Sequence, residues 1–182
     1  CSDRGFCPRY SWLGVPGEDE LHGAGVSYCG TCDGGFFTNQ EIGVVGSGDS
    51  ALDEAITLTQ FASTVTVLSR DASFLGQKVL QELVVEHPKL DVRWNTAVNS
   101  VIGESQVQGI SVTDVVSGEK SQIELEGLFI YVGLEPNTDY LSNLLPLDSG
   151  GHIPTDLCMR TPIPGLLAAG DIRQHSAAQL VS

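Results

Sequence analysis

The sequence is poor in basic residues and has no long apolar run. Its 182 residues include 9 lysines and arginines against 23 aspartates and glutamates, which gives a formal net charge of −14. Nucleic acids and anionic membranes bind basic protein surfaces, so this balance disfavours both as partners. No apolar run approaches the roughly 20 residues of a membrane-spanning helix. Residues 1–10 also lack the charged and then apolar pattern of a signal peptide.

The sequence also lacks clustered metal ligands and an even number of cysteines. The five cysteines are an odd number, which is untypical of a secreted disulfide scaffold. A zinc site needs four ligands, normally from two close pairs of Cys or His. Outside the stretch 25–34 the cysteines and histidines are scattered, at Cys1, Cys7, Cys158, His22, His87, His152 and His175. We therefore expect a protein of the reducing cytoplasm without a metal site.

The stretch 25–34 carries the most reactive group of side chains. Cys29 and Cys32 are separated by two residues, and Asp33 follows directly. Two thiols at this spacing can form a disulfide and open it again, because one thiol attacks while the other resolves. Asp33 can pass a proton to or from a thiolate. Half of a metal site or two inert cysteines are the alternatives; we interpret the three residues as a catalytic redox site.

A strand, a turn, a helix and a second strand follow. Residues 41–45 form a short apolar run typical of a buried parallel strand, and residues 64–68 form another. Between them, apolar residues recur at three- and four-residue spacing, as on the buried face of a helix. These residues are Leu52, Ala55, Ile56 and Thr59. The whole segment has about the 30 residues of a βαβ unit.

Residues 46–51, here called the glycine turn, lie between the first strand and the helix of this unit. In that position the pattern G-x-G-x-x-A predicts a nucleotide site. Gly46 allows the tight turn, Gly48 allows a pyrophosphate to approach the backbone, and Ala51 is the small third residue. N–H groups at the helix start face the phosphates. A βαβ unit that binds nothing is the alternative. The candidate ligands are Gly46, Ser47, Gly48, Asp49, Ser50 and Ala51.

The pattern predicts a further helix and strand before residue 95. The helix covers residues 77–86 and ends before Pro88. We expect four of its residues to face inward, namely Val79, Leu80, Leu83 and Val84. Residues 91–94 form a third strand.

Short strand-like runs then replace the helical pattern. Runs separated by turns between residues 97 and 125 predict an antiparallel meander, and residues 128–133 return as a buried strand. Residues 134–165 form a loop-rich crossing. Residues 165–171 read as a small-residue strand that places Asp171 at the carboxyl end of a sheet, where ligands bind. A helix N-cap is an equally good reading of Asp171.

Five stretches in this order resemble the low-molecular-weight thioredoxin reductases, flavoproteins with two dinucleotide-binding domains. They are residues 13–18, 29–33, 46–51, 128–136 and 164–171, and the resemblance covers residues 13–182. It implies an α/β, Rossmann-like three-layer FAD/NAD(P)-binding fold with an antiparallel β-meander and partial flavin-domain segments. The expected domains are a flavin-domain edge at 1–23, a pyridine-nucleotide domain with the CxxC at 24–133, and a return to the flavin domain at 134–182.

The resemblance also implies roles for individual residues. In such enzymes electrons pass from NADPH to FAD, then to the CxxC disulfide and on to thioredoxin. Cys32 would face the flavin, Cys29 would attack the disulfide of the partner, and Asp33 would be the acid or base. FAD would contact positions that match Gly170, Asp171 and Gln179. The full-length protein would be a homodimer.

This chain departs from the family pattern in three places. It opens without the GxGxxG strand for the adenosine part of FAD and ends before the last helix, so we expect a fragment that binds FAD poorly and is inactive alone. The family clamps the 2′-phosphate of NADPH with His-Arg-Arg and a further Arg; here Ser69, Arg70, Asp71 and Leu75 stand there. Asp71 would repel a phosphate. An Arg-Gln pair near the flavin reads Ala-Gln, at residues 178–179.

The sequence therefore predicts a thioredoxin-reductase-like flavoprotein that uses FAD and either NADPH or NADH, with thioredoxin or a similar protein as partner. Asp71 follows Gly46 by 25 residues, near the ~20-residue offset of an acidic residue that binds the ribose 2′-OH of NAD. We expect NADH to serve as well as NADPH or better. Alternatives are ferredoxin or another donor, a flavin-dependent dithiol oxidase, and a nucleotide-binding redox module without turnover.

Overall fold

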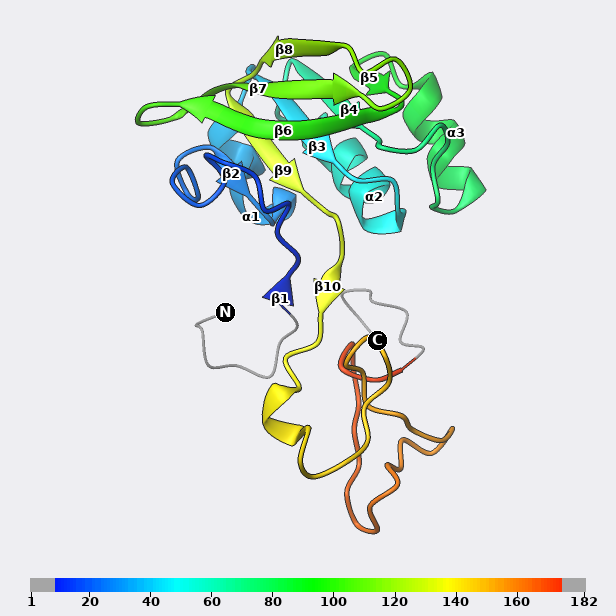
Figure 1. Cartoon of the computed structure of the whole chain (residues 1–182). Coiled ribbons are helices and arrows are strands. Elements are labelled where there is room, and N and C mark those ends of the chain that lie inside the picture. The colour runs from blue at the N-terminus through cyan, green and yellow to red at the C-terminus, as the bar shows by residue number, and fades with distance from the viewer. Residues whose placement is uncertain (1–8, 175–182) are drawn as a thin grey trace. The chain divides into compact units, whose positions relative to one another are not determined.

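A computed structural model of the chain describes residues 9–174 (Figure 1). The chain divides into two compact units. Unit 2 comprises Trp12–Val132, and unit 1 comprises Cys1–Ser11 with Gly133–Ser182. Residues 1–8 and 175–182, which include Cys1, Cys7 and Gln179, lie outside the described part of unit 1. The domain boundaries expected from the sequence stay a prediction.

A five-stranded parallel sheet forms the centre of unit 2. Its strand order is β2-β9-β3-β4-β5. The strands are β2 (Val26–Ser27), β3 (Glu41–Val45), β4 (Thr64–Leu68), β5 (Leu90–Arg93) and β9 (Gly127–Ile130). Helix α2 (Asp49–Leu58) connects β3 to β4, and helix α3 (Lys78–Glu86) connects β4 to β5. The βαβ unit expected at 41–68 is therefore confirmed.

A three-stranded antiparallel sheet covers the face of the central sheet that lies opposite helices α1 (Gly30–Asp33) and α2 (Figure 1). It consists of β6 (Thr96–Gly103), β7 (Val107–Asp114) and β8 (Lys120–Glu124), in the order β6-β7-β8. Its Val101, Ile110 and Val112 join a cluster with Leu128 of β9. The meander predicted from the sequence is confirmed, and with it the three-layer α/β fold.

Strands β3 and β9 carry almost continuous apolar runs because both of their faces are covered. In β3, Ile42 and Val44 pack on the helix side, whereas Val45 packs on the meander side. In β9, Phe129 belongs to the helix-side cluster and Leu128 to the meander-side cluster. Alternation of side chains along a strand sends neighbours to opposite faces, and burial on both faces explains the continuous apolar runs of these strands.

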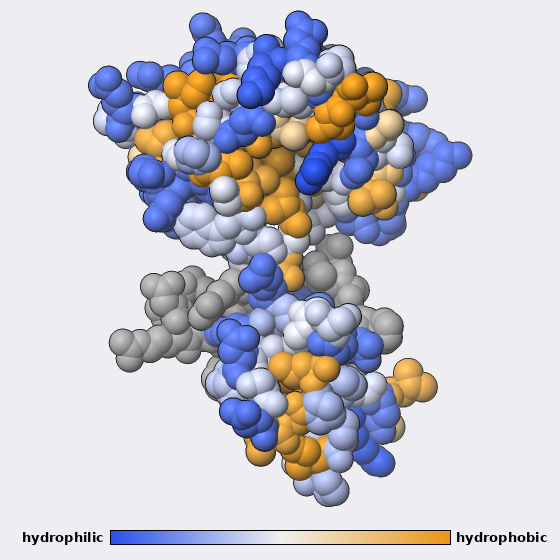
Figure 2. Space-filling model, in the orientation of Figure 1, coloured by the Kyte–Doolittle hydropathy of each residue, from blue (hydrophilic) through white to orange (hydrophobic). Residues whose placement is uncertain are grey.

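Helix α3 is present where the sequence predicts it, but its buried face is narrower. Val84 is fully buried and Leu80 packs against the helix-side cluster. The inward positions predicted for Val79 and Leu83 are wrong, since their exposed fractions are 66% and 51%. Positions 80 and 84 lie four residues apart on one row of the helix, and Val79 and Leu83 lie on the adjacent row. Figure 2 shows that hydrophobic residues are exposed at several places on this face of the molecule.

The described part of unit 1 is built mainly from loops. Strand β1 (Arg9–Tyr10) pairs antiparallel with β10 (Leu134–Glu135), and η2 (Asp139–Leu141) is a short 3-10 helix. The strand predicted over residues 165–171 is wrong, because this segment makes an isolated bridge at Leu167 but forms no strand. Gly165 and Gly170 both have φ of 83°, which is incompatible with extended backbone. In residues 9–174, no helix has the length and apolar character to cross a membrane.

Candidate functional site

The two cysteines lie on a single helical turn next to the sheet edge. Strand β2 ends at Ser27, and helix α1 (Gly30–Asp33) follows with Cys29 as its N-cap residue. One helical turn brings positions three apart to the same side, and Cys29 and Cys32 are joined by a disulfide with their Cα atoms 5.3 Å apart. Cys32 is exposed and Cys29 is half-buried, so the disulfide can be approached from solvent.

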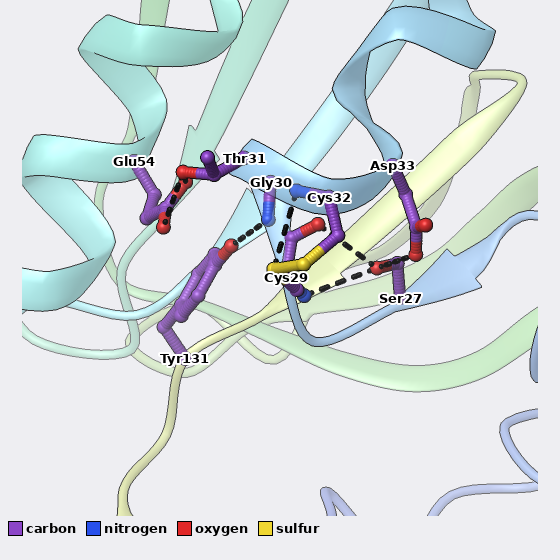
Figure 3. Close-up of a disulfide and its surroundings, with 8 residues drawn as sticks. All are labelled: Ser27, Cys29, Gly30, Thr31, Cys32, Asp33, Glu54 and Tyr131. Carbon is purple, nitrogen blue, oxygen red and sulfur yellow. Dashed lines mark hydrogen bonds between the residues drawn. A yellow bond between two sulfur atoms is a disulfide. The ribbon is translucent and has the colours of Figure 1, made fainter. Parts of the chain in front are cut away.

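Asp33 is fixed on one side of this helix by Ser27. The Ser27 hydroxyl donates to Asp33 Oδ2 at 2.6 Å and accepts the Cys29 N–H at 3.1 Å (Figure 3). Ser27 is buried and Asp33 is half-buried. The structure thus brings the three predicted catalytic residues together, and Ser27 ties the carboxylate of Asp33 to the backbone of the first cysteine.

Tyr131 and Glu54 contact the opposite side of the same helix, and sequence reasoning missed both. The Gly30 N–H donates to the hydroxyl of Tyr131 at 2.6 Å. Thr31 Oγ1 donates to the two carboxylate oxygens of Glu54, at 3.3 and 3.4 Å. Figure 3 shows Glu54 and Tyr131 on one side of the disulfide and Asp33 with Ser27 on the other. Glu54 lies three residues after the buried Ala51 and four before the buried Leu58, but this spacing does not indicate a contact with the redox helix.

The environment of Glu54 disfavours its charged form. Burial raises the pKa of the Glu54 carboxyl group, the hydrogen bond from Thr31 lowers it, and the charge of Asp53 raises it again, with a net upward shift. The carboxyl group of Glu54 lies close to Gly30, the first of the two residues between the cysteines, since a Cβ on Gly30 would lie 2.5 Å from Glu54 Oε2. The carboxyl group of Glu54 therefore lies against the backbone of the redox helix.

The glycine turn has the geometry that its sequence predicts. Gly46, with φ of 148°, follows β3 and leaves no room for a side chain, because a Cβ there would overlap the Tyr131 carbonyl and lie 2.7 Å from the Cβ of Ala51. A Cβ on Gly48 would meet nothing within 4 Å. The backbone is therefore open to a ligand at Gly48, where helix α2 begins. These residues fit a pyrophosphate.

The position of this turn in the sheet also suits a nucleotide. Strand β3 has β4 on one side and β9 on the other, so the connections after β3 and β9 diverge. Such a switch point opens a crevice beyond the carboxyl ends of the strands, where α/β sheets bind their ligands. Gly46 follows β3 and Tyr131 follows β9 at this point. The Tyr131 N–H donates to the Val45 carbonyl at 2.8 Å, which holds the two chain segments together.

Two predicted ligands of this turn are engaged with the loop after β4. The Ser47 carbonyl accepts the N–H groups of Leu75 at 2.8 Å and Gly76 at 3.0 Å. Asp49 Oδ1 accepts the Gln77 N–H at 2.5 Å. The loop that carries position 75 is therefore fastened to the glycine turn, and the residues predicted to bind a nucleotide after β3 and after β4 are brought together.

The residues after β4 differ in what they can offer a ligand. Ser69 is fully buried, and its hydroxyl is used by the backbone of Asp71, to whose carbonyl it donates at 3.0 Å and from whose N–H it accepts at 3.2 Å. Arg70 and Asp71 are exposed. Leu75 is 74% exposed. A ligand at this edge would therefore meet one guanidinium, one carboxylate and one apolar side chain.

The residues predicted to contact FAD are described only in part. Gly170 and Asp171 form a turn, in which the Arg173 N–H donates to the Gly170 carbonyl at 3.1 Å. Gln179 lies outside the described residues. The described residues of unit 1 include no glycine turn that leads into a helix, so those two residues do not enclose a flavin by themselves.

The described residues include no cluster of metal ligands. Among residues 9–174 no group of three or more His, Cys, Asp or Glu side chains is placed to hold a metal ion. Cys158 is a free, exposed cysteine.

Curated proteins similar to this chain are named thioredoxin reductases. The chain is 44% identical over 171 residues to the thioredoxin reductase of Listeria monocytogenes, and 42% identical over 175 residues to that of Bacillus subtilis. These matches cover 93% and 96% of this chain but 54% and 55% of the relatives. The chain thus spans about half the length of the curated relatives it matches.

Solved structures give the same result. The thioredoxin reductase of Lactococcus lactis superimposes with a TM-score of 0.89 at 40% identity, covering 95% of this chain and 57% of that one. That of T. acidophilum superimposes with a TM-score of 0.89 at 33% identity, with the same coverage. The family described as pyridine nucleotide-disulphide oxidoreductase matches residues 5–182. The chain therefore belongs to the pyridine nucleotide-disulphide oxidoreductase family, and its resemblance to the thioredoxin reductases is confirmed.

Proposed function

We propose that this chain supplies the redox and nucleotide-binding part of a flavin-dependent protein-disulfide reductase, with thioredoxin or a similar protein as substrate. The observation that carries the proposal is the Cys29–Cys32 disulfide on a solvent-accessible helix, with Asp33 held beside it by Ser27. The relatives named thioredoxin reductase support the choice of thioredoxin as partner. FAD, when bound to the complete protein, supplies the two electrons for the disulfide.

The exchange with a partner disulfide conserves electrons and protons. Two electrons and one proton open the Cys29–Cys32 bond and leave a thiolate on Cys29 and a thiol on Cys32. The thiolate attacks one sulfur of the partner disulfide, and the other partner sulfur leaves as a thiolate and takes up a proton. Cys32 loses its proton and attacks Cys29, which restores the disulfide and releases the second partner sulfur as a thiolate. That thiolate takes up the proton that Cys32 released, so the partner gains two electrons and two protons, the proton for its first thiolate coming from solvent.

Asp33 is the residue suited to move these protons. Its carboxylate lies next to Cys32 in the chain and is oriented by the Ser27 hydroxyl. A carboxyl group in this position can accept the proton of Cys32 before attack and deliver it to a leaving thiolate. Ser27 would then act as a positioning residue, because it touches Asp33 and the Cys29 backbone rather than a sulfur atom.

An exposed aromatic side chain shortly after the redox helix in the chain supports a protein substrate. Phe36, in the 3-10 helix η1 (Gly34–Phe37) that directly follows α1, is 81% exposed. Large aromatic side chains at an interface carry much of its binding energy. Phe36 would therefore contact a partner that presents its disulfide to Cys29.

The donor proposed for this chain is a nicotinamide nucleotide, with NADH used at least as well as NADPH. The glycine turn fits a pyrophosphate, and Asp71 lies after the adjacent strand β4, where an acidic residue can accept the ribose 2′-OH. A 2′-phosphate would meet Arg70 but also the charge of Asp71 and the apolar Leu75. Ferredoxin is the alternative donor. A protein that uses no nucleotide would also have no need of the residues that bind the 2′-phosphate, and this chain lacks most of them.

One anaerobic experiment tests the whole proposal. The flavin-loaded protein that carries this sequence is mixed in turn with NADH, NADPH and reduced ferredoxin, and flavin bleaching is followed by absorbance. Oxidised thioredoxin is then added and its new thiols are counted. We expect bleaching by NADH and turnover of thioredoxin. Bleaching without any protein-disulfide turnover would instead favour a dithiol oxidase or a redox module without turnover.

A further inference from the structure

Two carboxyl groups flank the redox helix, and the proposed chemistry uses one of them. Asp33 lies on one side of α1, held by Ser27. Glu54, from the middle of helix α2, lies on the other side, next to Thr31 and Tyr131 (Figure 3). Thr31 is one of the two residues between the cysteines. The contact of Thr31 with Glu54 therefore lies within the segment that joins the two cysteines.

Helix α1 depends on such outside contacts. It has four residues, which is less than one full set of helical hydrogen bonds, and helices this short are not stable alone. On the Glu54 side it is held by the bonds from Gly30 to Tyr131 and from Thr31 to Glu54. The close approach of Glu54 Oε2 to Gly30 shows that the carboxyl group also packs against the helix backbone.

The surroundings of Glu54 are negatively charged. The ion pairs of the described residues are Lys78–Glu82, Arg93–Asp91 and His152–Asp148, so Glu54 takes part in none of them. The elements packed against α2 are α1, α3, β3 and β4. Among the charged residues of these elements and of α2 itself, Lys78 is the one cation, and it is paired with Glu82. The ionisable residues of these elements and of the contacts with α1 are Asp33, Glu41, Asp49, Asp53, Lys78, Glu82 and Glu86, together with Cys29, Cys32 and Tyr131.

We propose that Glu54 is a positioning residue of the redox site, which holds α1 through Thr31 and whose negative charge disfavours thiolate formation at the cysteine pair. This inference rests on the proposed thiol–disulfide exchange. Where reduction leaves a thiolate on Cys29, it adds negative charge to a helix that already has Glu54 against its backbone. The repulsion raises the cost of a thiolate and so favours the disulfide, which makes the reduced pair a stronger reductant.

The size of the effect follows from Coulomb's law. At a dielectric between those of protein and water, a like charge within about 10 Å changes the equilibrium of thiolate formation by about fivefold. Because the folded-state pKa of Glu54 is raised, the charge is present above that pKa and is lost as the pH falls through it. The influence of Glu54 on the cysteines should therefore fade at acid pH.

The test compares three variants of the chain with the wild type. Glu54→Gln removes the charge but keeps an oxygen that can accept from Thr31. Asp53→Asn removes a charge from the neighbouring, exposed position of the same helix and is the matched control. Thr31→Val keeps the charge of Glu54 and removes the hydrogen bond. Each protein is equilibrated in dithiothreitol buffers of graded potential, and alkylated Cys29 and Cys32 are quantified separately by mass spectrometry.

We expect Glu54→Gln to lower the thiol pKa and, at pH values at which reduction leaves a thiolate, to shift the equilibrium about fivefold toward the reduced pair, with no shift at acid pH. Asp53→Asn should change the disulfide–dithiol equilibrium less than twofold. Thr31→Val should shift this equilibrium measurably from that of the wild type, because the helix loses its hydrogen bond to Glu54. Equal behaviour of Glu54→Gln and Asp53→Asn, with Thr31→Val like the wild type, would overturn the proposal. A pair that cannot be reduced reversibly in the wild type would instead contradict the proposed function.

Discussion

The hydroxyl of Tyr131 accepts the N–H of Gly30 at 2.6 Å, although the two residues lie 101 positions apart in the chain. The backbone carbonyl of the same tyrosine lies against Gly46, where it excludes a Cβ. One residue after strand β9 therefore contacts both the redox helix and the glycine turn. This arrangement fixes the disulfide relative to the edge of the sheet at which a nucleotide would bind.

Replacing Tyr131 with Phe should loosen the redox helix. The buried Gly30 N–H would lose its acceptor, which typically costs about 1–3 kcal/mol. Native-state hydrogen exchange should show faster exchange of the Gly30 amide, by about tenfold or more, while the amides of strand β4 stay unchanged as an internal control. Unchanged protection of Gly30 would mean that Tyr131 does not hold the helix.

Serine at either cysteine of the pair should abolish protein-disulfide reduction. Without Cys29 no nucleophile attacks the partner, and without Cys32 the mixed disulfide is not resolved. The measurement is thioredoxin turnover by the flavin-loaded protein that carries this sequence, with thiol counting before and after mild reduction. Cys158→Ser, at a free and exposed cysteine, is the control and should keep full activity. Full reductase activity in Cys29→Ser would show that the roles assigned to the pair are wrong.

Glu18 should be important for the stability of unit 2. It is 1% exposed, and its carboxylate accepts N–H groups from Leu13, Gly14 and Val15 and the hydroxyl of Tyr28. Its removal leaves four donors without their acceptor.

We therefore expect Glu18→Ala to lower the free energy of unfolding by about 3 kcal/mol or more, since several buried polar groups are affected together. The exposed Glu20 accepts a single N–H, from Gly17, and Glu20→Ala should cost less than about 1 kcal/mol. Urea unfolding of both variants measures the difference. Similar losses in the two variants would contradict the role given to Glu18.

Local patterns in the sequence were sufficient to predict most of the central sheet. Strands 41–45 and 64–68 have the bounds that the apolar runs indicate, because burial on both faces leaves a continuous signal. The glycine turn could be predicted because Gly46 and Ala51 pack too closely to allow larger side chains. The Cys29–Cys32 pair could be found from spacing alone.

What could not be predicted depends on contacts between distant segments. Nothing local to Glu54 or Tyr131 indicates that both touch the redox helix. The apolar period of helix α3 shows that it is amphipathic, but the choice between the row of Leu80 and that of Val79 depends on how α2 packs against it. The small-residue run 165–171 has the composition of a strand and of a loop alike, and the positive φ of its glycines decides between them.

Phe36→Ala should weaken the use of a protein substrate more than that of a small disulfide. Loss of a large exposed aromatic contact from an interface raises KM for thioredoxin about five- to tenfold, with kcat nearly unchanged. Turnover of a small aromatic disulfide should stay the same. Leu157→Ala, which removes another fully exposed apolar side chain, is the control. Equal losses with both substrates would point to a disturbed helix rather than to a lost contact.

The choice of nicotinamide nucleotide gives the last prediction. A 2′-phosphate needs fixed positive charge, and a bidentate guanidinium suits it best. The edge after β4 offers Arg70, while the hydroxyl of Ser69 is engaged with the backbone and Leu75 is apolar. Asp71 repels a phosphate but can accept the hydroxyl of an unmodified ribose. We therefore expect kcat/KM for NADH to equal or exceed that for NADPH in the flavin-loaded protein that carries this sequence.

Direct binding of the reduced nucleotides, followed by fluorescence titration, tests the same residues without turnover. Leu75→Arg should strengthen NADPH binding by about tenfold and leave NADH nearly unchanged, because position 75 is fastened to the glycine turn through Ser47. Leu75→Gln, which adds polarity without charge, is the matched control and should favour neither nucleotide. Asp71→Asn should narrow the difference between them. A wild-type preference for NADPH of about 100-fold, or about 2.7 kcal/mol, would contradict the role of Asp71 and would make Arg70 a sufficient phosphate ligand by itself.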